Sequence, residues 1–219
     1  MDESLRVAVV EDQPLFCSML VTLLRSQAGI ATVFSAGDVK TAREVIRPGG
    51  ADVAVLDIHL PDGNGMELGL ALRKTDPELG IVLLSSLDIM DSLLSLPAGK
   101  RRGWSYLSKT STTSTVSLMR AIRSSAAGGT MLDPDLVQRS VPRAGSPIGG
   151  LTPRQLHALR LLAQGFSNGA IAQELSISPH SVDNLLNALY FALGLQAEPG
   201  RNSRVSAVLK FLEGTARAA

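Results

Sequence analysis

The 219-residue sequence has few of the residues that build disulfide frameworks and metal clusters, with one cysteine and three histidines. A single cysteine excludes an internal disulfide, and so few Cys and His side chains are not enough for a Cys/His metal cluster. Cys17 falls in a helical pattern, where a small buried side chain is its expected role. We therefore expect neither a disulfide framework nor a Cys/His metal cluster.

Long apolar runs are also missing from the chain. It contains no segment of about 18 consecutive apolar residues, which is the length that a membrane-spanning helix needs. The acidic and polar start, Met1-Asp2-Glu3-Ser4, does not have the pattern of a signal peptide. We expect a soluble, cytoplasmic protein with no membrane partner.

Neither sign of charge dominates, since the net charge is only +1. The part before Ser125 has 13 Lys and Arg against 14 Asp and Glu, and the rest has 8 against 6. The net charge therefore changes from −1 to +2, which has the sign expected of a nucleic-acid-binding second part. The difference is too small to predict DNA binding by itself.

The first half of the chain alternates short apolar runs with helical patterns. The runs predict strands at Leu5–Val10, Ile30–Phe34, Asp52–Leu56, Ile81–Leu84 and Trp104–Leu107. Helices are expected at Pro14–Ala28, Asp38–Ile46, Asn64–Lys74 and Thr113–Ala127. Continuous β-branched runs suit strands that are buried on both faces. The alternation predicts an α/β domain with a doubly wound, five-stranded parallel sheet.

Five polar residues stand where these strands end, namely Glu11, Asp12, Asp57, Ser85 and Lys109. Ligands of open parallel sheets bind beyond the carboxyl ends of the strands. Three carboxylates placed together are costly unless a cation neutralises them, and hard oxygen ligands suit Mg²⁺. Lysine and serine can stabilise the oxygens of a transferred phosphoryl group. The pattern therefore predicts phosphoryl transfer to a carboxylate.

Each of these residues also fits an ordinary role on its own. Glu11 and Asp12 stand before Gln13-Pro14 and could cap a helix. Ser85 fits a turn, and Lys109 fits a solvated surface position. Five suitable groups at suitable strand ends make the combination of ordinary roles the weaker explanation.

Residues 5–127 resemble the receiver domain of response regulators, with matching segments VAVVEDQPLF, VAVLDIHLPDGNGMEL, IVLLSSLD and GWSYLSK. The resemblance implies a flavodoxin-like fold in which Asp57 accepts a phosphoryl group from a sensor histidine kinase. It implies that Glu11, Asp12 and Asp57 hold Mg²⁺, and that Ser85 and Lys109 assist the transfer. It also implies a conformational switch formed by Ser85 and Tyr106. Such a protein is not an enzyme, apart from self-catalysed phosphotransfer and dephosphorylation.

The same carboxylates have a second interpretation, a haloacid-dehalogenase-like phosphatase. That class requires an Asp two residues after the nucleophile, whereas this chain has His59 there. We expect His59 to be a loop side chain that modulates how water reaches the site. The segment Pro97–Arg102 departs from the receiver pattern, and its basic run is expected to form a solvated loop.

Between the two halves, residues 129–150 are expected to form a linker. A short helix is predicted from Asp133-Pro134 to about Ser140. The segment Ser140–Gly150 is rich in Pro, Gly and Ser without apolar periodicity, which predicts a flexible connection. The expected domains are therefore residues 1–128 and 151–219.

The pattern of the second half predicts a small all-α domain. Thr152-Pro153-Arg154-Gln155 has the pattern of a capped helix start, and Gly165 ends that helix. A second helix follows Ser167, a third runs from Ser178 to Leu193, and a fourth spans Arg201–Leu212. Two short helices joined by a tight turn predict a helix-turn-helix.

Residues 151–212 resemble the LuxR-type output domain of NarL/FixJ-class regulators. The matching segments are LTPRQ and LRLLAQG, followed in sequence order by the short matches SN, IA, L, IS, SV and N. The resemblance implies a transcriptional regulator whose helix Ser178–Leu193 enters the major groove of double-stranded DNA, with an active homodimer. The residues nearest the DNA would be His180, Ser181, Asp183, Asn184 and Asn187.

That helix nevertheless lacks the cations expected of it, since Ser178–Leu195 contains no Lys or Arg. Phosphate contacts supply much of the affinity for DNA. Asn184 and Asn187 can still bond to base edges, and Arg154, Arg160, Arg201 and Arg204 could add charge from neighbouring helices. The alternative is a regulator that acts mainly through a protein partner bound at Leu185, Tyr190 and Phe191, with weak or no DNA binding.

Overall fold

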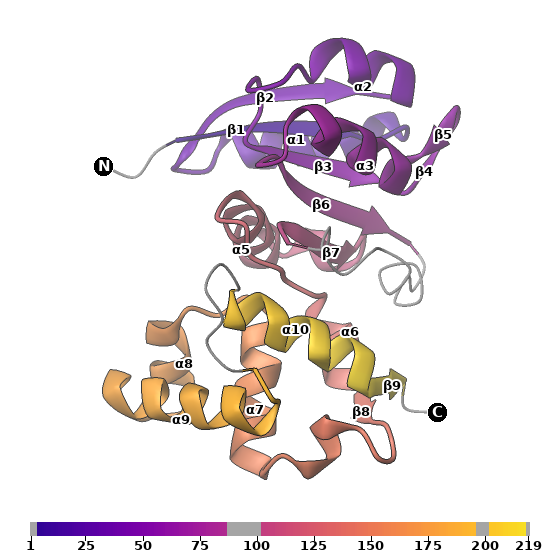
Figure 1. The fold of residues 1–219 in the computed structure, drawn as a ribbon. Coiled ribbons are helices and arrows are strands. Elements are labelled where there is room, and N and C mark those ends of the chain that lie inside the picture. Colours follow the sequence, from indigo (N-terminus) through magenta and orange to yellow (C-terminus); the bar gives the residue numbers. More distant parts are fainter. Residues whose placement is uncertain (1–3, 87–101, 196–201, 218–219) are drawn as a thin grey trace. The chain divides into compact units, whose positions relative to one another are not determined.

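The computed structural model describes residues 4–86, 102–195 and 202–217, and the chain divides into two compact units between Gly129 and Thr130 (Figure 1). The first unit is a parallel sheet with helices and the second is mainly helical. The predicted fold class is therefore confirmed. Pro97–Lys100 and Arg101 lie outside the described residues, so the expected solvated loop there stays a prediction.

The sheet of the first unit contains β1 (Leu5–Val10), β2 (Ile30–Ala36), β3 (Val53–Asp57), β6 (Gly80–Ser85) and β7 (Trp104–Ser108). All neighbours are parallel, in the order β2-β1-β3-β6-β7. From β1 the chain moves to one edge and then reverses past β1 to the other. Because such crossovers are right-handed, the reversal places helices on both faces of the sheet.

Among the described residues of this unit, the α-helices are α1 (Pro14–Arg25), α2 (Val39–Val45), α3 (Gly65–Thr75) and α5 (Thr115–Ala126). Every residue of β3 and β6 is buried, as expected for strands covered on both faces. The edge strand β2 instead mixes buried and exposed residues. Asp57 and Ser85 are therefore the last residues of two fully buried strands, which hold their backbones in place.

A short hairpin follows β3, which the sequence did not predict. It pairs β4 (His59–Leu60) with β5 (Gly63–Asn64). The Asp62 carboxylate at its tip accepts hydrogen bonds from the backbone N–H groups of Val39 (2.7 Å) and Lys40 (3.0 Å). The bond from Val39 is the main cause that lowers the pKa of Asp62. These bonds tie the loop after Asp57 to the start of α2.

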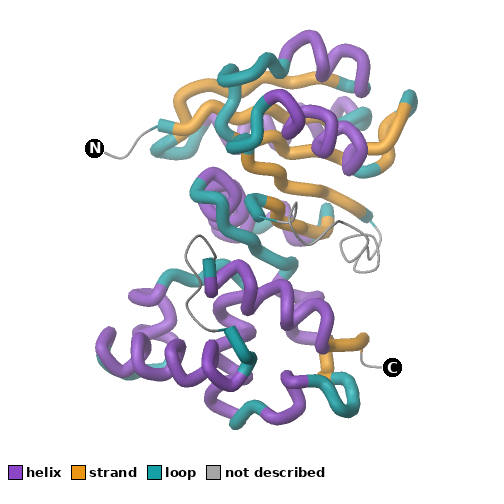
Figure 2. The backbone as a smooth tube through the Cα atoms, in the orientation of Figure 1, coloured by secondary structure: helices purple, strands orange, loops and turns teal. Residues whose placement is uncertain are grey.

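At Ser140–Gly150, where the sequence predicts a flexible connection, the structure instead contains short regular elements. After α6 (Pro134–Arg139), β8 (Ser140–Pro142) pairs antiparallel with β9 (Thr215–Arg217), and η3 (Pro147–Gly150) follows as a 3-10 helix (Figure 2). Ile148 is buried, and the Ser146 hydroxyl donates to the Gly214 carbonyl (2.8 Å). The segment forms these elements because it hydrogen-bonds to residues 214–217, which are distant in the sequence.

Besides α6, the α-helices among the described residues of the second unit are α7 (Pro153–Ala163), α8 (Asn168–Glu174), α9 (Pro179–Ala192) and α10 (Ser203–Gly214). Thr152 and Gln155 form the predicted capping box, while Ser167 and Ser178 cap α8 and α9. Among the helices of the described residues, none is both long and apolar enough to cross a membrane.

We predict that Gly65→Ala distorts the phosphoacceptor loop. A Cβ atom at position 65 would overlap the backbone carbonyl of Asp57, and backbone atoms cannot swing aside as a flexible side chain does. The free energy of unfolding of the first unit should fall by about 1–3 kcal/mol. Urea unfolding followed by the fluorescence of Trp104, the only tryptophan, measures this. Gly37→Ala is the matched control, because a Cβ there meets no atom within 4 Å; equal losses in both variants would contradict the prediction.

The Asp52 carboxylate should stabilise the first unit in a pH-dependent way. Arg6 donates to it from Nη2 (2.7 Å), and this side-chain bonding is the main cause that lowers the pKa of Asp52. A lowered pKa gives stability above the unfolded-state value, near 4, that is lost as the pH falls through the folded-state value. Because both side chains are partly exposed, Asp52→Asn should cost about 1 kcal/mol or less at pH 7. In Trp104-monitored urea melts the difference should shrink below about pH 4; a constant difference would count against this.

Candidate functional site

The three carboxylates expected at the strand ends lie together in the structure. Glu11 directly follows β1, and Asp57 is the last residue of β3. One ligand oxygen from each of Glu11, Asp12 and Asp57 lies within 4.8 Å of the other two. Glu11 and Asp57 are both 2% exposed, whereas Asp12 is exposed to solvent. Two carboxylates of the cluster are therefore buried, and the third is accessible to water.

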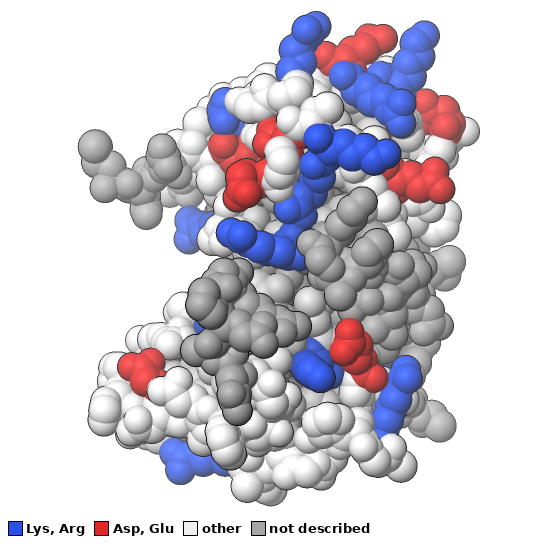
Figure 3. Space-filling model, in the orientation of Figure 1, with Lys and Arg blue, Asp and Glu red and all other residues white. Residues whose placement is uncertain are grey.

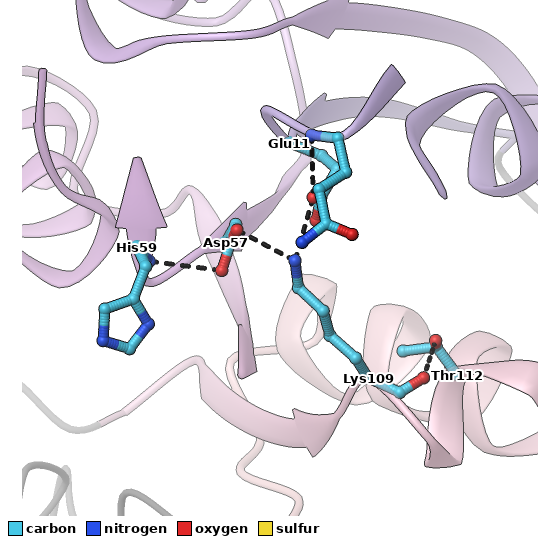
Figure 4. Close-up of polar contacts among 6 residues, drawn as sticks. Glu11, Asp57, His59, Lys109 and Thr112 are labelled. Carbon is cyan, nitrogen blue, oxygen red and sulfur yellow. Dashed lines mark hydrogen bonds and ion pairs between the residues drawn. The ribbon is translucent and has the colours of Figure 1, made fainter. Parts of the chain in front are cut away.

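Lys109, which directly follows β7, contacts two of these carboxylates. Its Nζ donates to Glu11 Oε1 and to Asp57 Oδ2, each at 2.9 Å (Figure 4). The Lys109 backbone N–H donates to the Ser85 carbonyl (2.8 Å), and the Thr112 hydroxyl donates to the Lys109 carbonyl (2.6 Å). The backbone of the residue is thus fixed on both sides, which aims its side chain at the carboxylates.

Burial and charge oppose each other at Glu11 and Lys109. Burial raises the pKa of the Glu11 carboxyl above its ordinary value, although the hydrogen bond from Lys109 opposes the shift. Burial alone would lower the pKa of Lys109, but its bonds to Glu11 and Asp57 raise it overall. Lys109 therefore stays charged and holds two carboxylates that would otherwise repel each other.

The residues fit a magnesium ion. Glu11 Oε2 is buried, and among the described residues it has no hydrogen-bond partner. A buried carboxylate oxygen without a partner is costly, and a hard cation that takes oxygen ligands would satisfy it. Asp12 adds a carboxylate on the solvent side, where Mg²⁺ commonly keeps several waters. The chemistry of this donor set is therefore that of a magnesium site.

The second oxygen of Asp57 faces the hairpin. Asp57 Oδ1 accepts a hydrogen bond from the backbone N–H of His59 (3.2 Å), while the His59 side chain is exposed (Figure 4). What the structure shows for His59 is thus a backbone contact to Asp57, while its expected influence on water stays a prediction.

Sequence reasoning missed two supports of the site. Lys109 Nζ lies 5.1 Å from the centre of the Phe16 ring, a distance at which a cation and an aromatic face attract each other. Thr112 is fully buried beneath the backbone of Lys109. Phe16 stands in the first turn of α1, only five residues after Glu11, and that proximity was the available signal.

The two expected switch residues are both buried. Ser85 ends β6 and is 0% exposed, and Tyr106 in β7 is 2% exposed and pairs in register with Leu83. They lie on adjacent strands, so a movement at one strand end can reach the other. Their switching role stays a prediction.

The five residues expected to contact DNA all lie on the solvent side of α9, namely His180, Ser181, Asp183, Asn184 and Asn187. The opposite side of the helix is buried through Val182, Leu186 and Leu189. A hydrogen bond joins Asn184 Nδ2 and His180 Nε2 (3.3 Å). The arrangement places the amide and imidazole side chains on the exposed face of the helix.

Asp183 is connected to a cation through an intervening amide. Asn168 Nδ2 donates to Asp183 Oδ1 (3.1 Å), and Arg204 Nη1 donates to Asn168 Oδ1 (3.1 Å). Arg160 instead turns toward the backbone and donates to the Ser140 carbonyl (3.2 Å). Arg154 is exposed, and Arg201 lies outside the described residues.

The three-residue apolar surface suggested for a protein partner is only partly present. Leu185 and Tyr190 are half-buried, and burial raises the pKa of the Tyr190 hydroxyl. Phe191 is the exception, with 76% of its surface exposed. The suggested surface is therefore corrected to one exposed aromatic ring.

Comparisons with known proteins match both units. Residues 7–121 match the response regulator receiver domain, and residues 150–197 match the bacterial regulatory proteins of the luxR family. The first match alone covers more than half of the chain.

Relatives match over nearly the full length. The DNA-binding transcriptional activator DevR/DosR of Mycobacterium tuberculosis is 30% identical over 197 residues, covering 87% of this chain and 89% of that protein. The nitrate/nitrite response regulator protein NarP of Escherichia coli is 30% identical over 213 residues, covering 95% and 94%. A solved LuxR-family two-component response regulator from Aurantimonas superposes with a TM-score of 0.54 at 26% identity, covering 62% of this chain and 94% of that one.

Mg²⁺ should stabilise the first unit through Asp12. A ligand that binds only the folded state stabilises it by mass action, here by about 1–3 kcal/mol at saturating Mg²⁺. Asp12→Asn removes the exposed carboxylate of the cluster, so we expect most of this gain to disappear. Thermal melts followed by Trp104 fluorescence, with and without Mg²⁺, measure the effect. Glu44→Gln, an exposed acidic residue in α2, is the control and should keep the full gain; an undiminished gain in Asp12→Asn would place the ion elsewhere.

Proposed function

The chain belongs to the bacterial response regulators that join a receiver domain to a luxR-family regulatory domain, and we propose that phosphorylation of Asp57 controls its binding to promoter DNA. Members of this family are transcriptional regulators, not enzymes. The observation that carries the proposal is the paired contact of Lys109 Nζ with Glu11 and Asp57 at the carboxyl edge of the sheet. The proposed partners are a sensor histidine kinase, double-stranded DNA and a second copy of the chain.

The proposed chemistry is phosphoryl transfer to Asp57. A carboxylate oxygen of Asp57 attacks phosphorus, a P–O bond forms, and the P–N bond of the kinase phosphohistidine breaks with its electron pair returning to the imidazole. Lys109 neutralises charge on the phosphoryl oxygens, since its Nζ already lies 2.9 Å from Asp57 Oδ2. When bound at Glu11, Asp12 and Asp57, Mg²⁺ supplies further neutralisation of those oxygens. Hydrolysis of the acyl phosphate by water restores the carboxylate.

The exposed side of α1 is suited to the phosphoryl donor. Leu15 is 88% exposed and Met19, one turn later, is 38% exposed. Leu15 is adjacent to Phe16, whose ring lies near Lys109 Nζ. A kinase domain that brings its phosphohistidine to Asp57 would bury these apolar side chains, which supports this side as the approach route.

Phosphorylation must then change the rest of the unit. We propose that the Ser85 hydroxyl moves toward a phosphoryl oxygen and that the ring of Tyr106 follows. The bond from the Lys109 backbone to the Ser85 carbonyl supports such coupling, because it links the ends of β6 and β7. The phosphorylated conformation would favour a homodimer that presents two copies of α9 to paired half-sites.

A protein-binding regulator is the second candidate function. The absence of Lys and Arg from Ser178–Leu195 favours it, because phosphate contacts supply most non-specific DNA affinity. The exposed Phe191 also favours it. Against it, Leu185 and Tyr190 are half-buried and leave little apolar surface for a partner.

A genomic-fragment binding selection tests the proposed function. Purified protein, with and without beryllofluoride and Mg²⁺, is offered host DNA at two salt concentrations. We expect a shared palindromic sequence to be enriched, more strongly with beryllofluoride and more weakly at high salt.

The control for this selection is Asp57→Asn, which should neither take up a phosphoryl group nor respond to beryllofluoride. Phosphoryl incorporation that persists undiminished in this variant would refute the assignment of Asp57. Failure to enrich any sequence in either state would favour the protein-binding candidate.

A further inference from the structure

The exposed Phe191 shares one face of α9 with the polar residues expected to contact DNA. His180, Asp183, Asn184, Asn187 and Phe191 follow the spacing i, i+3, i+4, i+7 and i+11, which places them on one stripe of an α-helix. All five are exposed. We call these five residues the α9 stripe.

Among the described residues, the packing of α9 does not account for Phe191. The core side of α9 is filled by Val182, Leu186 and Leu189, which lie opposite the stripe. Leu185 and Tyr190, two larger side chains at the flanks of the helix, are half-buried. The ring is therefore the one apolar member of a stripe that is otherwise polar.

The α9 segment that carries Phe191 has few charged residues in its sequence. Asp183 is the only Asp, Glu, Lys or Arg between Ser178 and Leu195. In the part of this region that Figure 3 leaves uncovered, most of the surface is uncharged. An exposed aromatic ring gains nothing from a phosphate group, but it gains from burial against an apolar group. In the major groove, that apolar group is the 5-methyl of thymine.

We propose that Phe191 contacts a thymine 5-methyl group in the major groove and so helps to select the DNA sequence. The inference rests on the proposed function, because it requires α9 to enter the groove. Phe191 lies four residues beyond Asn187, which is about 6 Å along the helix axis and spans about two base pairs. Asn184 and Asn187 would bond to base edges at one end of the site, and Phe191 would read a thymine at the other.

Replacing thymine by uracil tests this contact, because the exchange removes only the methyl group. The probe is a duplex enriched from a random-sequence library by the beryllofluoride-loaded full-length protein, with each thymine replaced in turn. We expect one position in each half-site at which uracil weakens wild-type binding about three- to tenfold. Phe191→Ala should weaken binding to the thymine duplex by a similar factor and should be insensitive to uracil at that position.

The test is a double-mutant cycle between Phe191 and the methyl group. Phe191→Leu is the conservative variant and should keep part of the uracil effect. Val141→Ala, which removes another exposed apolar side chain, should bind like the wild type. Because Phe191 is exposed, its replacement should leave the melting temperature of the second unit unchanged.

Two results would overturn the inference, and they are distinguishable from failure of the proposed function. If uracil and Phe191→Ala weaken binding independently at every position, or if Phe191→Ala binds as tightly as the wild type, Phe191 does not read a methyl group. If the wild-type protein enriches no duplex at all, the proposed function fails and this inference falls with it.

Discussion

The arrangement of the first unit depends on one ion-pair contact, that of Lys109 Nζ with Glu11 and Asp57. Two buried carboxylates at adjacent strand ends repel each other, and the raised pKa of Glu11 records the cost of its burial. A single ammonium group placed 2.9 Å from both offsets that repulsion and remains charged because both carboxylates raise its pKa. Without this cation, the carboxyl edge of β1 and β3 would be an unfavourable place for either acid.

The strand order is what allows this contact. β1 and β3 are neighbours, so Glu11 and Asp57 leave adjacent strands at the same edge, while Lys109 follows β7, which is separated from β3 by β6. β6 lies between β3 and β7 and ends in Ser85. The same Ser85 carbonyl anchors the Lys109 backbone. β6 therefore separates the strand that ends in Asp57 from the strand that precedes Lys109, and it also holds the Lys109 backbone.

Much of this was predictable from the sequence, because apolar runs and the polar residues that end them are local signals. The strand Leu5–Val10 was predicted with the bounds that the structure shows, and the carboxylates at strand ends follow once the sheet is parallel. Pairing between distant short segments was not predictable. Strands as short as β8 and β9 have no readable periodicity, and the loop at Asp62 is fixed by backbone groups of α2. Phe16 and Thr112 were missed for the same reason, since their roles appear only when Lys109 is in place.

The second unit raises the question of how a helix without Lys or Arg can bind a polyanion. Part of the answer is the chain of bonds from Asp183 through Asn168 to Arg204, which sets a cation near the only acidic side chain of α9. With few phosphate contacts, the proposed affinity of one copy for a half-site would be low and would depend on base-edge contacts. Two linked copies gain an effective concentration that one copy lacks, so weak half-site binding makes occupancy depend steeply on dimerisation. In the proposed function, an α9 without Lys or Arg therefore makes DNA binding more strictly conditional on phosphorylation of Asp57.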